Sequence, residues 1–179
     1  TYVQEVVGVF LYYTRSVDCT MLAALGSLAS QQANPTQTTM KRVQQFLDYA
    51  ATNPDAIITY RASNMILAAH SDASYLSETK ARSRAGGHFF FSENDEYPNN
   101  NGAVLTISQI IKAVMSSAAE AELGALFYNC QDGTVLRLAL EELGHVQPPT
   151  PVHCDNSTAV SIANDTVKKQ RSRAMEKNF

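Results

Sequence analysis

The sequence has few cysteines and no long apolar run. Its three cysteines, Cys19, Cys130 and Cys154, are odd in number, widely spaced and never arranged as Cys-x-x-Cys. This pattern argues against a disulfide framework or a structural zinc site and favours a reducing compartment. No apolar stretch reaches about eighteen residues, and the first residues lack the basic region of a signal peptide. We therefore expect an intracellular chain with no membrane partner.

Charge is also sparse. Charged residues make up 17% of the 179 residues, apolar residues 45%, and the net charge is −3. This composition supports one medium domain, or a small domain with an appendage, and it argues against binding nucleic acid by bulk electrostatics alone. Thr1 is not an initiator residue, and the last residues fall within a charged run. We therefore expect a piece of a longer polypeptide, cut at both ends.

The first third of the chain has the periodicity of helices. Apolar side chains recur at helical spacing in three sets: Val6, Val7, Phe10 and Leu11; Met21, Leu22, Leu25 and Leu28; Met40, Val43, Phe46, Leu47 and Ala50. Pro35 and Thr36 indicate a helix start, and Asn53 with Pro54 indicates a stop. Residues 1–55 are therefore predicted to form a helical segment.

From Ala56 onward the pattern changes to that of strands. Apolar runs at residues 56–60, 65–70, 88–91 and 103–107, the last continuing to 114, predict strands, with turns at 61–64 and at Gly86-Gly87. We expect three antiparallel strands in succession. A long helix should begin at Ser116 or Ser117 with Glu120 in a capping box, followed by a brief strand at 151–154 and a second helix. An α/β domain over residues 56–179 follows.

Three acidic residues in separate segments carry the functional information. Asp72, Glu122 and Asp155 each sit at the end of an apolar stretch with few charges nearby. Carboxylates that meet at the rim of a core repel one another, and a cation bound between them offsets this repulsion. Such an arrangement is typical of a metal-dependent nuclease. Taken singly, Asp72 could instead serve a turn and Asp155 a helix cap, and Glu120 competes with Glu122 for the place on the helix.

Four segments, taken in order, resemble a known family. They are Ser-Asp-Ala-Ser-Tyr (71–75), Ser-Ser-Ala-Ala-Glu-Ala-Glu-Leu-Gly-Ala-Leu (116–126), Leu-Glu-Glu-Leu-Gly (140–144) and Cys-Asp-Asn-Ser-Thr-Ala-Val (154–160). Over about residues 63–179 the chain resembles the ribonuclease H domain of copia-type retrotransposon polyproteins. Residues 6–13 and 33–36 resemble the stretch that joins the polymerase thumb to ribonuclease H. No Tyr-x-Asp-Asp sequence of a polymerase site is present.

The resemblance implies a ribonuclease H-like mixed sheet and endonucleolytic hydrolysis of the RNA strand of RNA–DNA hybrids. Asp72, Glu122 and Asp155 would be both catalytic residues and metal ligands. They would hold two Mg²⁺ ions about 3.5–4 Å apart, with Mn²⁺ as a substitute and no need for a His or Cys ligand. The partners would be the hybrid and the remainder of a reverse transcriptase polyprotein, in the cytoplasm and, for an intact element, within a virus-like particle.

The chain departs from that family at its C-terminal end. The fourth carboxylate of the family lies beyond a fifth strand, on a last helix, and the sequence ends at Phe179 before either could form, so the domain is expected to be incomplete. Glu176 matches an acidic position in a connecting segment, and we interpret it as a solvated helix residue. Two alternatives follow: a catalytically inactive retroelement remnant, and a nucleic-acid-binding module on the same fold.

Basic residues provide candidate contacts to the hybrid, since its position is set by the phosphate backbone. They lie in two stretches that would otherwise be interpreted as solvated loops. Asn156, which follows Asp155 in the sequence, is a further candidate. The full set is Lys80, Arg82, Arg84, Asn156, Lys168, Lys169, Arg171 and Arg173.

Overall fold

The computed structural model describes residues 1–164, and its contacts divide the chain into two compact units, Thr1–Thr59 and the part from Tyr60 onward. The first unit is entirely helical. Its elements are α1 (Tyr2–Ser16), a short 3₁₀ helix (Cys19–Met21), α2 (Leu22–Gln31) and α3 (Gln37–Thr52). The predicted helices are confirmed, including the start of α3 at its N-cap Thr36 and its end at Asn53.

The helical unit has its own core. Residues from all three helices pack together there, and the buried members are Val3, Val6, Met21, Leu25, Leu28, Val43 and Phe46. Phe10 of α1 meets Phe46 of α3 edge to face, with ring centroids 5.1 Å apart. All of these buried residues except Val3 belong to the sets that recur at helical spacing in the sequence, although Leu11 and Met40 of those sets are exposed.

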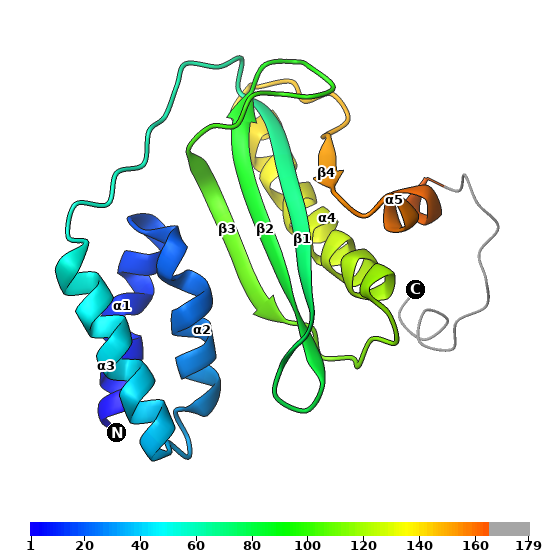
Figure 1. Cartoon of the computed structure of the whole chain (residues 1–179). Coiled ribbons are helices and arrows are strands. Elements are labelled where there is room, and N and C mark those ends of the chain that lie inside the picture. Colours follow the sequence, from blue (N-terminus) through cyan, green and yellow to red (C-terminus); the bar gives the residue numbers. More distant parts are fainter. Residues whose placement is uncertain (165–179) are drawn as a thin grey trace. The chain divides into compact units, whose positions relative to one another are not determined.

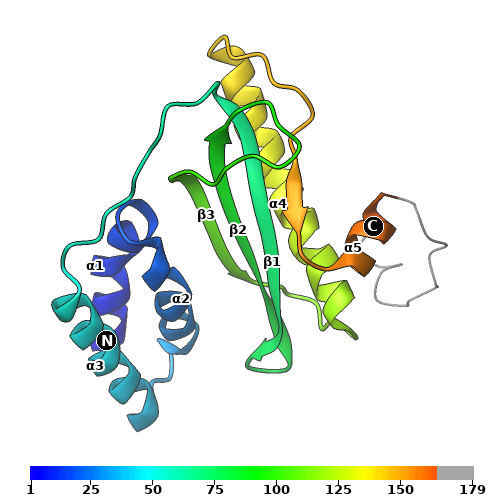
Figure 2. The same cartoon turned by 45° about the horizontal axis from the view of Figure 1, so that its top comes forward.

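The second unit is a mixed α/β sheet covered on one face by a helix. Its strands are β1 (Ile66–Glu78), β2 (Arg82–Ser92), β3 (Ala103–Ile110) and β4 (Val152–Cys154), and its helices are α4 (Ala118–Glu142) and α5 (Ser157–Ala163). The strand order is β3-β2-β1-β4, with β1, β2 and β3 antiparallel and β4 parallel to β1. Figures 1 and 2 show α4 running along one face of this sheet. The predicted α/β class is confirmed, as is the order of three strands, helix, strand and helix from Ile66 onward.

Two parts of the strand prediction are wrong. Residues 56–60 form no strand: Ile57 is 84% exposed, and no neighbouring strand pairs with this segment. An apolar run alone cannot form a strand without a partner for its backbone groups. The Tyr60 hydroxyl and the Arg61 amide instead donate to the Ala103 carbonyl and the Asn101 side chain.

Gly86 and Gly87 do not form the expected turn. They lie within β2, opposite Asp72 and Ser71 of β1, and the turn of the hairpin is at residues 79–81. The glycines serve packing. A Cβ on Gly87 would lie 2.1 Å from Oδ1 of the fully buried Asn129 of α4, whereas a Cβ on Gly86 would meet nothing closer than 3.6 Å. Gly87 therefore makes room for a helix side chain against the sheet.

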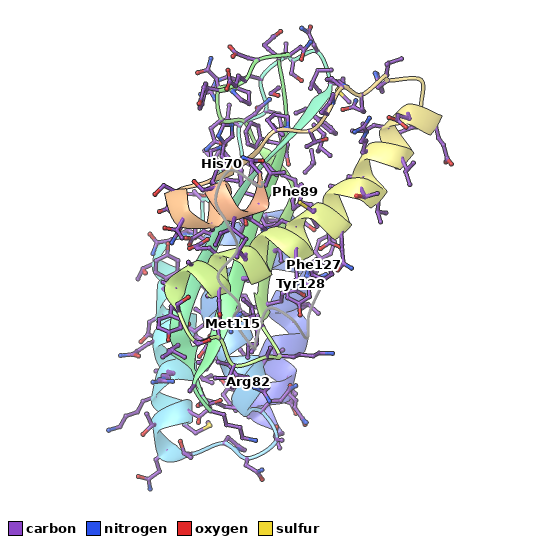
Figure 3. All side chains as sticks on the ribbon, turned by 90° about the vertical axis from the view of Figure 1, so that its right-hand side faces the viewer. His70, Arg82, Phe89, Met115, Phe127 and Tyr128 are labelled. Atoms are coloured by element: carbon purple, nitrogen blue, oxygen red, sulfur yellow. The ribbon has the colours of Figure 1, made fainter. Side chains whose placement is uncertain are left out.

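The long helix α4 has a close fit to the sheet. It begins after the N-cap Ser117 and continues through Gly133, where a Cβ would lie 3.3 Å from the Phe89 ring of β2. The cost of glycine inside a helix, about 1 kcal/mol relative to alanine, is thus offset by close packing on Phe89. Figure 3 shows Phe89 beside α4 and Arg82 at the hairpin end of the sheet.

The neighbouring glycines give a direct stability test. We expect Gly87→Ala to lower the free energy of unfolding by about 1–3 kcal/mol, because the added methyl group overlaps the Asn129 amide. Gly86→Ala is the matched control in the same strand and should change it by much less. Urea denaturation followed by circular dichroism measures both, and equal losses would contradict the packing role of Gly87.

Candidate metal centre

Two glutamates near the start of α4 have different roles. Glu120 closes the helix end: its Oε2 accepts from the Ser116 amide and hydroxyl at 2.8 and 2.6 Å, and its own amide donates to the Ser117 hydroxyl. Glu122 instead faces the sheet, where its Oε1 accepts from the Ala73 amide of β1 at 3.1 Å. Of the two, Glu122 is the one placed at the edge between β1 and β4.

The parallel pairing of β4 brings Asp155 to the same place. Ser71 pairs with Cys154, so Asp72 and Asp155 follow equivalent positions on adjacent strands. Glu122, Cys154 and Asp155 each offer a donor atom, and these atoms all lie within 4.8 Å of one another. The Cys154 thiol donates to Glu122 Oε2 at 3.6 Å. We call Glu122, Cys154 and Asp155 the donor group.

Asp72 lies beside this group without joining it. Its side chain is exposed, and its oxygens are not among the converging donor atoms. Its charge nevertheless contributes to the raised pKa of Glu122. The next residue, Ala73, supplies the amide that donates to Glu122. An incoming cation could therefore draw on a third carboxylate at the rim of the site.

Negative charge at this edge is poorly compensated. Burial raises the pKa of Glu122, and the charges of Asp72 and Asp155 raise it further, against the opposing bonds from the Ala73 amide and the Cys154 thiol. Burial also raises the pKa of the Cys154 thiol, with a further contribution from Glu122 and Asp155. Within residues 1–164 the ion pairs are Arg84–Glu78 and Arg137–Glu141, and neither involves the donor group. Two carboxylates and a thiol with no ion-pair partner in that range fit a divalent cation.

The candidate nucleic-acid residues have different surroundings. Lys80 lies in the hairpin turn and Arg82 begins β2, whereas Arg84 is inside the sheet and buried rather than in the expected loop. Its guanidinium donates to Glu78 at 2.7 Å and to Ser108. Asn156 caps α5 by accepting from the Ala159 amide. Lys168, Lys169, Arg171, Arg173 and Glu176 lie outside the described residues.

Three histidines line the sheet face opposite α4, at one level of the sheet. His88, His70 and His153 are paired neighbours on β2, β1 and β4. The ring centroids of His70 and His153 are 5.4 Å apart, and Tyr97 lies against His153 at the same distance. Burial, followed by the two neighbouring histidines, lowers the pKa of His70. The row is separate from the donor group, which lies toward α4.

Sequence reasoning missed Cys154 as a member of the site. The spacing of the three cysteines argues against a disulfide framework or a structural zinc site and indicates no other role for Cys154. Its position directly before Asp155, at the end of a short strand, is the signal that was available. Successive side chains within a strand point to opposite faces of the sheet. The strand ends at Cys154, and this constraint no longer applies to Asp155.

In the absence of a metal ion, removing the charge of Glu122 should stabilise the folded protein. The folded state raises the pKa of Glu122 above its ordinary value of 4.5, so ionisation costs stability as the pH rises through that range. In EDTA at neutral pH, Glu122→Gln should therefore melt at a higher temperature than the unchanged protein. The difference should shrink as the pH falls below the ordinary glutamate pKa, where both side chains are neutral in both states. A lower melting temperature for Glu122→Gln at neutral pH would contradict this.

The comparisons with known proteins give one match. The chain is 24% identical, over 157 residues, to the retrovirus-related Pol polyprotein from transposon TNT 1-94 of Nicotiana tabacum. The match covers 87% of this chain and 11% of that polyprotein, so the chain spans about a tenth of the length of its relative. No protein-family model and no solved structure matches the chain. None of the helices within residues 1–164 has the length and apolar character needed to cross a membrane. The chain is therefore similar, over most of its length, to a segment of a retrotransposon polyprotein.

Proposed function

We propose that the chain is a ribonuclease H-like domain of a retrotransposon polyprotein and hydrolyses the RNA strand of RNA–DNA hybrids with a divalent cation. The observation that carries this proposal is the meeting of Glu122 and Asp155, from segments far apart in the sequence, at one edge of a mixed sheet beside Asp72. The similarity to a Pol polyprotein gives the proposal its biological setting.

Glu122, Asp155 and Asp72 are the residues that would hold the cation. Mg²⁺ or Mn²⁺ bound there would supply an activated water and neutralise charge on the leaving 3′ oxygen. Glu122 is 6% exposed and is held by the Ala73 amide, so its orientation is fixed before a ligand arrives. Exposed Asp72 stands on the solvent side, where a phosphate group of the RNA could approach.

The number of carboxylates limits the expected activity. Three carboxylates can hold one Mg²⁺ firmly, but a second ion would keep more water and bind weakly. We therefore expect weak cleavage in Mg²⁺ and stronger cleavage in Mn²⁺, which is bound by the same oxygen ligands. Lys80 and Arg82 at the hairpin are the described candidates for phosphate contacts.

Cleavage of a labelled hybrid tests the proposal. In Mn²⁺ the chain should cut the RNA strand of an RNA–DNA hybrid and leave duplex DNA intact. Asp72→Asn, Glu122→Gln and Asp155→Asn should each lower the rate at least about a hundredfold, because each removes a charged ligand of the cation. Glu142→Gln is the matched control, since Glu142 is an exposed glutamate at the far end of the same helix.

The alternatives predict different results in the same assay. Binding of the hybrid without cleavage in either cation would favour a nucleic-acid-binding module. Neither binding nor cleavage would favour an inactive retroelement remnant. Cleavage that persists unchanged in all three carboxylate variants would place the active site elsewhere and overturn the assignment of these residues.

A further inference from the structure

The donor group contains a thiol as well as carboxylates. Cys154 Sγ lies with the Glu122 and Asp155 oxygens inside the 4.8 Å group, and its hydrogen bond points at Glu122. We propose that this centre binds thiophilic divalent cations of the zinc class, with Cys154 Sγ as a direct ligand between Glu122 and Asp155. The inference rests on the proposed function, because it names a second class of metal accepted by the same site.

The distance between the sulfur and one carboxylate oxygen matches a small tetrahedral ion. Zinc binds thiolate sulfur at about 2.3 Å and carboxylate oxygen at about 2.0–2.2 Å, so at the tetrahedral angle the sulfur and oxygen stand roughly 3.5 Å apart. Cys154 Sγ and Glu122 Oε2 are 3.6 Å apart. These two donors are therefore already spaced for one ion and need little movement to bind it.

A cation bound to Cys154 Sγ would replace the thiol proton that is now donated to Glu122 Oε2. On binding, the S–H bond breaks, the proton leaves to the buffer, and the sulfur forms a bond to the metal ion. The centre then has two carboxylates and a thiolate, whose combined negative charge a divalent cation largely offsets. Within the described residues no lysine or arginine forms an ion pair with any of the three. A bound metal ion would therefore balance the negative charge of a deprotonated Cys154.

A site with both thiolate and carboxylate ligands distinguishes thiophilic metal ions from those that prefer oxygen. Zn²⁺, Cd²⁺ and Co²⁺ accept sulfur readily, whereas Mg²⁺ prefers oxygen ligands in octahedral geometry. Asp72 lies outside the donor group and would serve an oxygen-bound ion only. The zinc-class ion and Mg²⁺ should therefore compete for Glu122 and Asp155 while using different third ligands.

Cobalt makes the sulfur ligand visible. Co²⁺ is titrated into the full 179-residue chain in a reducing buffer without chelators, and near-ultraviolet absorbance is followed for the charge-transfer band of a cobalt–thiolate bond. The unchanged chain should show the band, and Cys154→Ser should lose it. Co²⁺ affinity should fall at least about tenfold in Cys154→Ser, since even residues that only support a metal ligand contribute that much. Cys130→Ser, on the exposed side of α4, is the control and should keep both.

A parallel measurement separates this inference from the proposed function. The melting temperature of each variant is recorded by circular dichroism with and without Mg²⁺, which also verifies that Cys154→Ser is folded. If Mg²⁺ raises the melting temperature but no cobalt–thiolate band forms, or if the band survives in Cys154→Ser, the sulfur ligand is overturned and the carboxylate site stands. If neither Mg²⁺ nor Co²⁺ has any effect, both proposals fail.

Discussion

The lengthwise position of α4 on the sheet is the constraint on which the site depends. Fully buried Asn129 donates from Nδ2 to the Ser71 hydroxyl and the Gly86 carbonyl, at 2.8 and 2.9 Å. Glu122, seven residues earlier and so on the same face of the helix, accepts from the Ala73 amide. The two polar contacts, about two turns apart, fix α4 against β1 at two points. A helix that slid by one turn would leave both sets of polar groups buried without partners.

This arrangement favours a unique register over maximum stability. Asn129 Oδ1 is buried and has no hydrogen-bond partner within the described structure. Gly87 has no side chain and so leaves room for the Asn129 amide. An apolar residue at this position could pack without an unsatisfied oxygen, but it would not distinguish one helix position from the next. Because Ser71 and Ala73 flank Asp72, the same contacts set where Asp72 stands relative to Glu122.

Much of the fold was predictable, because periodicity and capping are local properties. The helices of the first unit, the three antiparallel strands and the start of α4 all follow from patterns of a few residues. The errors arose where the outcome depends on distant partners. Residues 56–60 look like a strand but have no neighbour to pair with, and Gly86-Gly87 looks like a turn until Asn129 of α4 is placed over it. Likewise, the sequence indicates Glu122 and Asp155 as candidates but does not indicate that Cys154 lies with them, since that depends on where β4 ends.

Under the proposed function, the electrostatics of the site would couple a cation to a polyanionic partner. The edge that holds Glu122, Asp155 and Asp72 is negative, so on its own it repels a phosphate backbone. The basic residues of the hairpin do not reverse this: Arg82 stands on β2 four residues from Gly86, the cross-strand neighbour of Asp72, which is roughly 13 Å along the strand. At that distance a charge exposed to solvent is screened at physiological salt. Within residues 1–164 no ion pair offsets these carboxylates, so an ion bound between them would change the local sign, and a phosphate oxygen beside it would in turn hold the ion. Cation and nucleic acid should therefore bind this edge cooperatively, each strengthening the binding of the other.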